Sequence, residues 1–377
     1  MTTESTWFLE RNHSLSACEI LKETHQSREI RFFHNNETVS VHPKGVSWGR
    51  LFPRVFTVNG SEKPDVFVVH NRAMLVCKHH DKATQNAVPR KIEDYRFQPF
   101  LADVMDSIHQ GQNVILTGGT GVGKTTHITQ LANRINHPLL RINFNGETRM
   151  SDLVGKIHVL GGETKWQDGV LPMAMRNGWW LLLDELDFAE PAVLSLLHPV
   201  LEEESVLVLK ENAGEIIHPH PNFRLFATAN SIGAMKDRAG SFAGTNDMNE
   251  AFLDRWQVIM VENLSVEEEI KVLKKACPGL RSAIARRIAE FAKKARDGDF
   301  SDYTGDNFST RKTIAWAKKA ELHRDAIRGA ELAWLDKIPK SDQESLHRSL
   351  KAMFGTGKRT SVKTAKRAFG AKAKMRS

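Results

Sequence analysis

Short, continuous apolar runs alternate with helical patterns through the middle of this 377-residue chain. Five of these runs have the length of a strand, and they lie at residues 113–117, 139–143, 179–184, 224–229 and 257–261. A strand in a parallel sheet reads as an unbroken apolar run, because helices cover both of its faces. The pattern therefore predicts an α/β domain over residues 91–263, built on a five-stranded parallel sheet.

The residues before this domain have a different pattern. Short apolar stretches are separated by turn signals, and they lie at residues 55–58, 66–70 and 73–77. Strand-length runs between turns predict a small β-rich domain over residues 1–90. The polar stretch at residues 81–92 contains a proline and indicates a linker.

The residues after the sheet domain are helical in pattern. Ser265 is followed three residues later by Glu268, which is the pattern of a capping box, so we expect a helix to begin there. Further amphipathic segments lie at residues 281–297, 310–322, 328–336 and 342–354. These segments predict an α-helical lid domain over residues 264–355.

The charge of the chain is concentrated at its C-terminal end. The net charge is +8, and residues 356–377 hold eight lysines and arginines and no acid, so the remainder is close to neutral. A charge run at a terminus is typical of a disordered, solvated tail. It can also bind nucleic acid or an acidic partner, and both interpretations stay open.

A glycine-rich loop follows the first apolar run of the sheet domain and precedes a helical pattern that begins at Thr126. Strand, G-x-x-x-x-G-K-[ST] and helix form a P-loop, whose backbone N–H groups surround phosphate oxygens. Lys124 can reach the β- and γ-phosphates, and the Thr125 hydroxyl can ligate Mg²⁺. The pattern predicts binding of ATP and Mg²⁺ by Gly118, Gly119, Thr120, Gly121, Val122, Gly123, Lys124, Thr125 and Thr126.

Two acids end the third apolar run. Asp184 follows Lys124 by sixty residues and is the candidate that holds Mg²⁺, while Glu185 is the candidate that polarises the attacking water. The alternative is an acidic surface turn after a core strand. The spacing from the P-loop favours the catalytic interpretation.

A polar amide ends the fourth apolar run. Asn230 follows a mostly apolar strand, and we expect it between the P-loop and the two acids, where it can hydrogen-bond the water or the γ-phosphate. The alternative is an asparagine that caps a turn. The order of the motifs along the chain favours the functional role.

These motifs together resemble the AAA+ ATPases, and more closely their MoxR branch. Five stretches are similar to the ATPase subunits of aerobic cobaltochelatase, and they lie at residues 152–156, 168–172, 220–230, 253–256 and 309–317. The last stretch departs from that family at Thr310, where those subunits usually have proline. The resemblance covers roughly residues 100–355 and leaves out the N-terminal region and the tail. It implies a homo-oligomeric ring, expected to be a hexamer, and a partner with a von Willebrand A-type domain.

The resemblance also assigns roles to two arginines. In ring ATPases an arginine at the position of Arg255 reaches the γ-phosphate of the neighbouring subunit, where a cation stabilises the charge of phosphoryl transfer. Arg311, which opens a helix of the lid, is expected to contact the same nucleotide. The alternatives are a local ion pair of Arg255 with Asp254 and a solvent-facing Arg311.

Two inserts have the pattern of β-hairpins. Residues 156–166 carry strand-like arms around two glycines, and residues 206–217 do so around a turn that ends in Gly214. In related ATPases such hairpins project toward the pore of the ring or toward a partner. The alternative is a pair of plain surface hairpins.

The function that we expect is an AAA+ ATP hydrolase that remodels a partner complex. The alternative is a DNA-associated ATPase that uses the basic tail, and a small-molecule kinase is disfavoured because it would not need Asn230, Arg255 and Arg311. No run approaches the ~18 apolar residues of a membrane span, so we expect no membrane partner. Three cysteines far apart indicate reduced thiols and a cytoplasmic location.

Overall fold

The computed structural model describes most of the chain in segments. They are residues 6–11, 14–23, 28–32, 38–41, 51–53, 66–77, 81–93, 95–145, 147–230, 248–300 and 308–355. Contacts divide the chain into two compact units, residues 1–263 and 264–377, which are described separately below. The apolar stretch at 55–58 and the basic tail at 356–377 lie outside the described residues.

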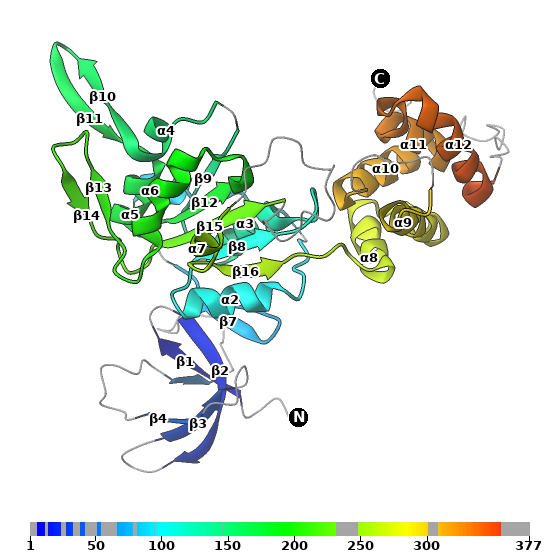
Figure 1. The fold of residues 1–377 in the computed structure, drawn as a ribbon. Coiled ribbons are helices and arrows are strands. Elements are labelled where there is room, and N and C mark those ends of the chain that lie inside the picture. The colour runs from blue at the N-terminus through cyan, green and yellow to red at the C-terminus, as the bar shows by residue number, and fades with distance from the viewer. Residues whose placement is uncertain are drawn as a thin grey trace, which may run out of the picture. The chain divides into compact units, whose positions relative to one another are not determined.

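The first unit is built on a five-stranded sheet (Figure 1). Its strands are β8 (Val114–Thr117), β9 (Leu139–Asn143), β12 (Trp180–Asp184), β15 (Arg224–Ala229) and β16 (Gln257–Met260). Their spatial order is β16-β8-β15-β12-β9, and every neighbouring pair is parallel. This confirms the predicted five-stranded parallel sheet, with each strand within about one residue of its apolar run.

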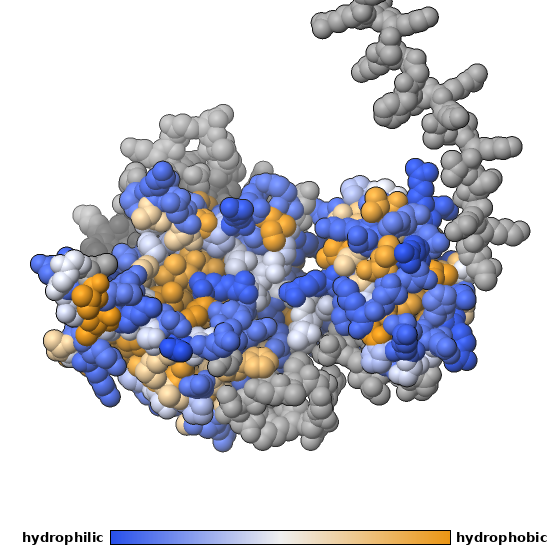
Figure 2. Space-filling view, turned by 90° about the horizontal axis from the view of Figure 1, so that it is seen from above, coloured by the Kyte–Doolittle hydropathy of each residue, from blue (hydrophilic) through white to orange (hydrophobic). Residues whose placement is uncertain are grey.

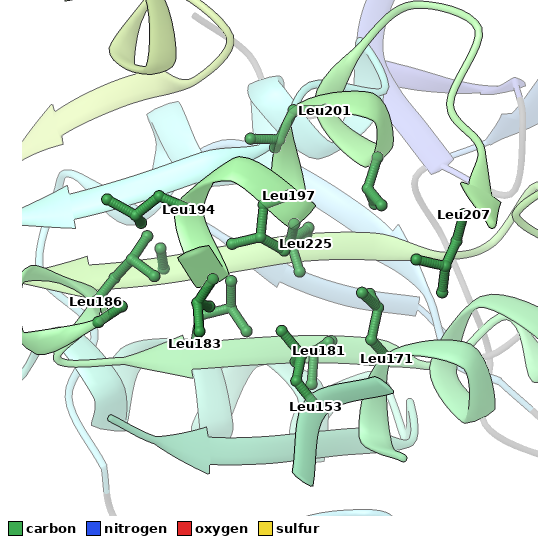
Figure 3. Close-up of a cluster of buried hydrophobic side chains, with 14 of the residues drawn as sticks. Leu153, Leu171, Leu181, Leu183, Leu186, Leu194, Leu197, Leu201, Leu207 and Leu225 are labelled. Carbon is green, nitrogen blue, oxygen red and sulfur yellow. The ribbon is translucent and has the colours of Figure 1, made fainter. Parts of the chain in front are cut away.

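The two faces of the sheet hold two separate hydrophobic cores. Alternate residues of β12 serve them in turn, because successive side chains of a strand point to opposite faces. Leu181 and Leu183 lie in one cluster with α5 (Val170–Asn177) and α6 (Pro191–Leu201), part of which is shown in Figure 3. Leu182 lies in the other cluster, which includes α2 (Leu101–His109) and α3 (Lys124–Arg134). Burial on both faces is why β12 is apolar at every position before its last residue, Asp184.

Two β-hairpins project from the first unit, as Figure 1 shows. One joins β10 (Gly155–Leu160), which follows α4 (Met150–Val154), to β11 (Glu163–Asp168), and the other joins β13 (Leu207–Leu209) to β14 (Glu215–Ile217). Both predicted hairpins are confirmed. The guanidinium of Arg176 on α5 connects their bases, with its Nε 3.0 Å from Asp168 Oδ2 and its Nη2 2.8 Å from Glu215 Oε2.

An antiparallel sheet occupies the N-terminal part of the first unit. Its strands are β1 (Thr6–Arg11), β2 (Ser14–Glu23), β3 (Arg28–Phe32), β4 (Thr38–Val41), β5 (Leu51–Pro53), β6 (Val66–Val69) and β7 (Arg72–Leu75). The order is β4-β3-β2-β1-β5, and β7 pairs with both β2 and β6. The apolar runs predicted β6 and β7, while β1 to β5 were not predicted because their charged and polar residues interrupt any apolar run.

The last strand of this sheet packs against the parallel-sheet core. Met74 of β7 is 4% exposed and belongs to the same hydrophobic cluster as α2 and α3. Arg72 forms a bidentate pair with Asp106 of α2, at 2.6 and 2.8 Å. The Cys77 N–H donates to the carbonyl of Ile135 at 2.7 Å.

The stretch that we expected to be a linker is instead packed against α3. It begins with the short helix α1 (Lys82–Asn86). The side chain of Gln130 accepts from the Ile92 N–H at 2.8 Å and donates to the Arg90 carbonyl at 3.0 Å, and Asn133 donates to the Pro89 carbonyl at 2.8 Å. The polar composition of this stretch suggested a linker. The hydrogen bonds that hold it come from a helix far away in the chain, and the local sequence does not reveal them.

The second unit is helical, as predicted. Its helices are α8 (Val266–Ala276), α9 (Ser282–Asp297), α10 (Thr310–His323), α11 (Ala326–Ala333) and α12 (Lys340–Phe354). The predicted capping box between Ser265 and Glu268 begins α8. Edge-to-face contacts between aromatic side chains and an ion pair between Arg296 and the fully buried Glu269, at 2.8 Å, hold the helices together. In the described ranges, every helix is too short or too polar to cross a bilayer.

Met74→Ala should destabilise the first unit by about 2–5 kcal/mol, because it removes a buried side chain shared by β7 and the parallel-sheet core. Urea denaturation followed by tryptophan fluorescence measures this loss. The matched control is Val68→Ala on the neighbouring strand, where the side chain is 51% exposed and the change should stay within ~0.5 kcal/mol. Equal effects of the two substitutions would mean that β7 does not pack against the core.

Candidate active site

The carboxyl ends of three neighbouring strands bring the candidate residues together. Thr117, the last residue of β8, pairs with Ala229 on β15, and Leu183 of β12 pairs with Ala227 of β15. The P-loop, the two acids and Asn230 therefore leave the same edge of the sheet side by side. Parallel strands require this, since all of their carboxyl ends lie at one edge.

The glycines of the P-loop are needed for close backbone approach. Gly118 has φ of +144°, and a Cβ at this position would lie 2.3 Å from the carbonyl oxygen of Val261, just beyond β16. Gly123 has φ of +103° and caps α3 without a side chain. The helix begins at Lys124, two residues earlier than predicted, so its first N–H groups face the loop and can bind an anion.

Lys124 is buried at the centre of the loop. Its Nζ donates to the carbonyls of Gly118 (2.7 Å) and Gly119 (2.9 Å) and to Asn230 Oδ1 (3.1 Å). Burial lowers the pKa of Lys124 to about 8, although the nearby charges of Asp187, Asp184 and Glu185 oppose the shift. A polyphosphate at this loop would place negative charge beside the ammonium group and so offset the solvation that burial removes.

Asp184 is buried beneath the loop, and hydroxyl groups hold it. Its Oδ1 accepts from Thr125 Oγ1 at 2.6 Å and from Thr228 Oγ1 at 2.5 Å. Carboxylate and hydroxyl oxygens are hard ligands of the kind that Mg²⁺ prefers. The close pairing of Thr125 and Asp184 therefore fits the predicted metal site.

Glu185 differs sharply from the acid before it. Its side chain is exposed, and its φ of +58° lies in the left-handed region that non-glycine residues rarely occupy. Its N–H donates to Thr228 Oγ1 at 3.0 Å, which fixes the strained backbone. Such strain persists only where surrounding contacts enforce it, and here it occurs at an exposed acid directly after the buried strand.

Asn230 lies where the sequence predicted it, between the P-loop and the acids. The residue is 8% exposed, and its N–H donates to Asp187 Oδ2 at 3.0 Å. Its side-chain oxygen accepts a hydrogen bond from Lys124. Among the described residues, this oxygen caps no turn. The amide group is therefore held against the lysine that is expected to contact phosphate.

Sequence reasoning missed Arg141 and Thr228, both of which contact Asp184. Arg141 of β9 forms an ion pair with Asp184 Oδ2, and its side chain is 50% exposed. Thr228 is 1% exposed and lies within an apolar strand, where it looks like an ordinary core residue. The signal for Arg141 was a lone charge inside a strand-length apolar run.

A buried histidine supports the P-loop from behind. His127 Nε2 accepts from the Gln98 N–H at 3.0 Å, so the proton of the neutral ring lies on Nδ1. From there it donates toward the Gly123 carbonyl, 2.8 Å away, with Tyr95 Oη also at 2.8 Å from Nδ1. Burial lowers the pKa of His127 to about 4, which keeps the ring neutral.

Of the two arginines that the resemblance singled out, Arg255 lies in the same unit as this cluster and does not join it, and Arg311 belongs to the second unit. Arg255 precedes β16 and so lies at the amino edge of the sheet, where it pairs with Glu202 at 2.6 Å and not with Asp254. Arg311 is exposed in the first turn of α10, in the second unit. The hydrogen bonds of the P-loop cluster within the first unit are therefore made without Arg255.

Comparison with known proteins gives relatives of one kind. The AAA domain of the dynein-related subfamily matches residues 113–256. The aerobic cobaltochelatase subunit CobS of a Sinorhizobium species is 31% identical over 71% of this chain and 83% of its own length. Midasin of Dictyostelium discoideum is 28% identical over 62% of this chain but only 4% of midasin. Protein NorQ of Paracoccus denitrificans is 37% identical over 31% of this chain and 43% of its own length.

Binding of ATP at pH 8.5 should be accompanied by uptake of roughly half to one proton, because the phosphate charge raises a lysine pKa that burial has lowered to about 8. At pH 7 the lysine is already charged, so the uptake should nearly vanish. Calorimetry in two buffers of different ionisation enthalpy measures it. Lys156→Met, which removes an exposed lysine on β10, should leave the uptake unchanged. Uptake that is the same at both pH values would contradict this assignment.

Proposed function

The chain belongs to the MoxR branch of the AAA+ ATPases and is an ATP hydrolase, and from this we propose that it works in an oligomeric ring that remodels a partner complex. The observation that carries the catalytic part is the arrangement around Asp184. Three features meet at one edge of the sheet. The buried Asp184 carboxylate accepts a hydrogen bond from the P-loop residue Thr125, and the buried Lys124 donates one to Asn230. The third feature is the exposed side chain of Glu185.

The P-loop residues bind and orient ATP in this proposal. Lys124 exchanges its carbonyl partners for the β- and γ-phosphates, and the open N–H groups of α3 add partial positive charge. Thr125 and Asp184 would hold Mg²⁺, which when bound neutralises charge on the phosphate oxygens. His127 keeps Gly123 in its left-handed conformation while the loop changes partners.

Glu185 and Asn230 act on the attacking water. The carboxylate of Glu185 is exposed and faces away from the sheet, so it can orient the water and accept its proton. Asn230 is held by Lys124 and can hydrogen-bond the γ-phosphate or the same water. The strained backbone of Glu185 is consistent with a residue positioned for chemistry.

The position of Arg255 supports an active site shared between subunits. Gln257, the first residue of β16, pairs with Val114 at the start of β8, whereas the P-loop follows the end of β8. About 10 Å of strand therefore separates Arg255 from the phosphate edge of its own chain. We place Arg255 against the nucleotide of a neighbouring subunit in a hexameric ring, and Arg311 against the nucleotide from the lid.

Exposed apolar side chains on both hairpins support a role in partner binding. Ile157 and Val159 on β10 are 51% and 72% exposed, and Val208 and Ile216 on the second hairpin are 42% and 59% exposed. Apolar surface appears in orange in Figure 2, which views the molecule from above. One relative is named as a subunit of a cobaltochelatase. We therefore propose a multi-subunit complex whose partner carries a von Willebrand A-type domain and whose other subunits handle the substrate.

Two further features of the chain are assigned on composition. Cys77 and Cys277 are free thiols, which supports a cytoplasmic location for the complex. The DNA-associated alternative depends on the basic residues 356–377, which lie outside the described residues. No described contact favours it over the ring ATPase.

Glu185→Gln should retain ATP binding and lower the turnover by at least about a hundredfold, because the amide keeps the shape of the side chain but cannot accept a proton. Nucleotide binding is measured by equilibrium titration and turnover by phosphate release. The matched control is Glu190→Gln, an exposed acid next to the start of α6, which should hydrolyse ATP at the normal rate. Normal turnover by Glu185→Gln would show that another group accepts the proton.

Arg255→Ala should bind ATP almost normally and hydrolyse it slowly, since a supplied arginine contributes ~10³–10⁵ to the rate in other P-loop enzymes. Mixing it with Lys124→Ala subunits should restore activity, because some interfaces then pair an intact P-loop with an intact arginine. Glu202→Ala breaks the same ion pair but leaves the arginine, so it should remain active. Co-assembled mixtures that stay inactive would instead place Arg255 in its own subunit's site.

A further inference from the structure

The two oxygens of the Asp184 carboxylate have different partners. Oδ1 accepts from the hydroxyls of Thr125 and Thr228, which are both neutral. Oδ2 accepts from the guanidinium of Arg141, its one hydrogen-bond donor among the described residues. The charge of this buried carboxylate is therefore balanced by Arg141, and a metal ion held by Asp184 would supply positive charge to the same carboxylate.

Arg141 reaches this oxygen from the neighbouring strand. In the register of the sheet, Arg141 pairs with Leu182 and Asn143 pairs with Asp184. Arg141 therefore lies two residues before the position opposite Asp184, and its long side chain spans that distance along β9. The Asp184 side chain is only 5% exposed, whereas that of Arg141 is 50% exposed.

The two cations near Asp184 are held very differently. Lys124 is 7% exposed, and three hydrogen bonds fix its ammonium group in the loop. The guanidinium of Arg141 has one carboxylate partner and free access to water, so it can leave at little cost in solvation. Of the two, Arg141 is the cation that can be exchanged.

We infer that Arg141 is the counter-ion of Asp184 in the metal-free site and that it would compete for this carboxylate with a Mg²⁺ ion bound together with the nucleotide. This rests on the proposed function, which gives Asp184 its role in holding the metal. The exchange keeps a buried carboxylate compensated in both states. It also makes Arg141 a competitor of the metal, so this positioning residue sets the metal concentration at which the site fills.

The test measures metal binding without turnover. The probe is Mn²⁺, titrated into protein saturated with ADP and followed by electron paramagnetic resonance. Arg141→Gln should lower the free Mn²⁺ concentration at half-saturation about two- to fivefold, the effect of removing a half-exposed ion pair. Arg141→Lys, which keeps the charge without the planar guanidinium, should shift it less.

Two controls separate this effect from others. Arg176→Gln removes a comparable, partly exposed arginine that is paired with carboxylates at the base of the hairpins, and it should leave the Mn²⁺ titration unchanged. In nucleotide-free and metal-free protein, Arg141→Gln should lower the thermal midpoint, because Asp184 loses its counter-ion. With ADP and saturating Mn²⁺ present, the difference in midpoint should disappear.

An unchanged or higher Mn²⁺ concentration at half-saturation in Arg141→Gln would overturn the inference, since the arginine would then be neutral or helpful to the bound metal. If Arg141→Gln does not fold, Arg141→Lys decides the matter by the same criterion: a lower half-saturation supports competition, and an equal or higher one excludes it. Wild-type protein that binds neither ADP nor Mn²⁺ would contradict the proposed function instead.

Discussion

The site depends on compensating one charge at the end of a strand that is buried on both faces. Asp184 terminates β12, whose residues are all buried, so its carboxylate cannot rely on water. The two strands beside β12 supply part of the compensation, since β15 brings Thr228 and β9 brings Arg141, and the P-loop after β8 brings Thr125. Without these partners, Asp184 would hold an uncompensated buried charge.

The same packing explains the contrast between two adjacent acids. Asp184 points into the sheet and is held by three side chains, while the left-handed backbone of Glu185 carries the next carboxylate out to solvent. Thr228 contributes to both, because its hydroxyl donates to Asp184 and accepts from the Glu185 N–H. One buried threonine thus couples the residue suited to hold a metal to the residue suited to activate water. Valine has the same shape as threonine but cannot make either hydrogen bond.

The sequence predicted the parts of the fold and the site that are local in the chain. Apolar runs located all five strands of the parallel sheet, and the acids and Asn230 could be placed because polar residues end those runs. The residues that it missed depend on contacts across strands. Arg141 and Thr228 lie in the middle of strand patterns, and only the register shows that both reach Asp184. Residues 81–92 read as a linker for the same reason, since their partners Gln130 and Asn133 lie on a helix about forty residues away.

The geometry of a parallel sheet also limits what one chain can do alone. Groups at the carboxyl edge can contact the phosphates. A residue just before β16 lies at the opposite edge, and its side chain is too short to reach the phosphates of its own chain. Arg255 is such a residue, and in the single chain its charge is balanced by Glu202. Arg141 reaches toward the carboxyl edge from within β9, and there it pairs with a carboxylate oxygen of Asp184. The free chain therefore holds both arginines in ion pairs with its own acids, so a metal–nucleotide complex and a neighbouring subunit would each have to replace an existing ion pair. In each pair the arginine is partly exposed, so a displaced guanidinium would return to water at little cost in solvation.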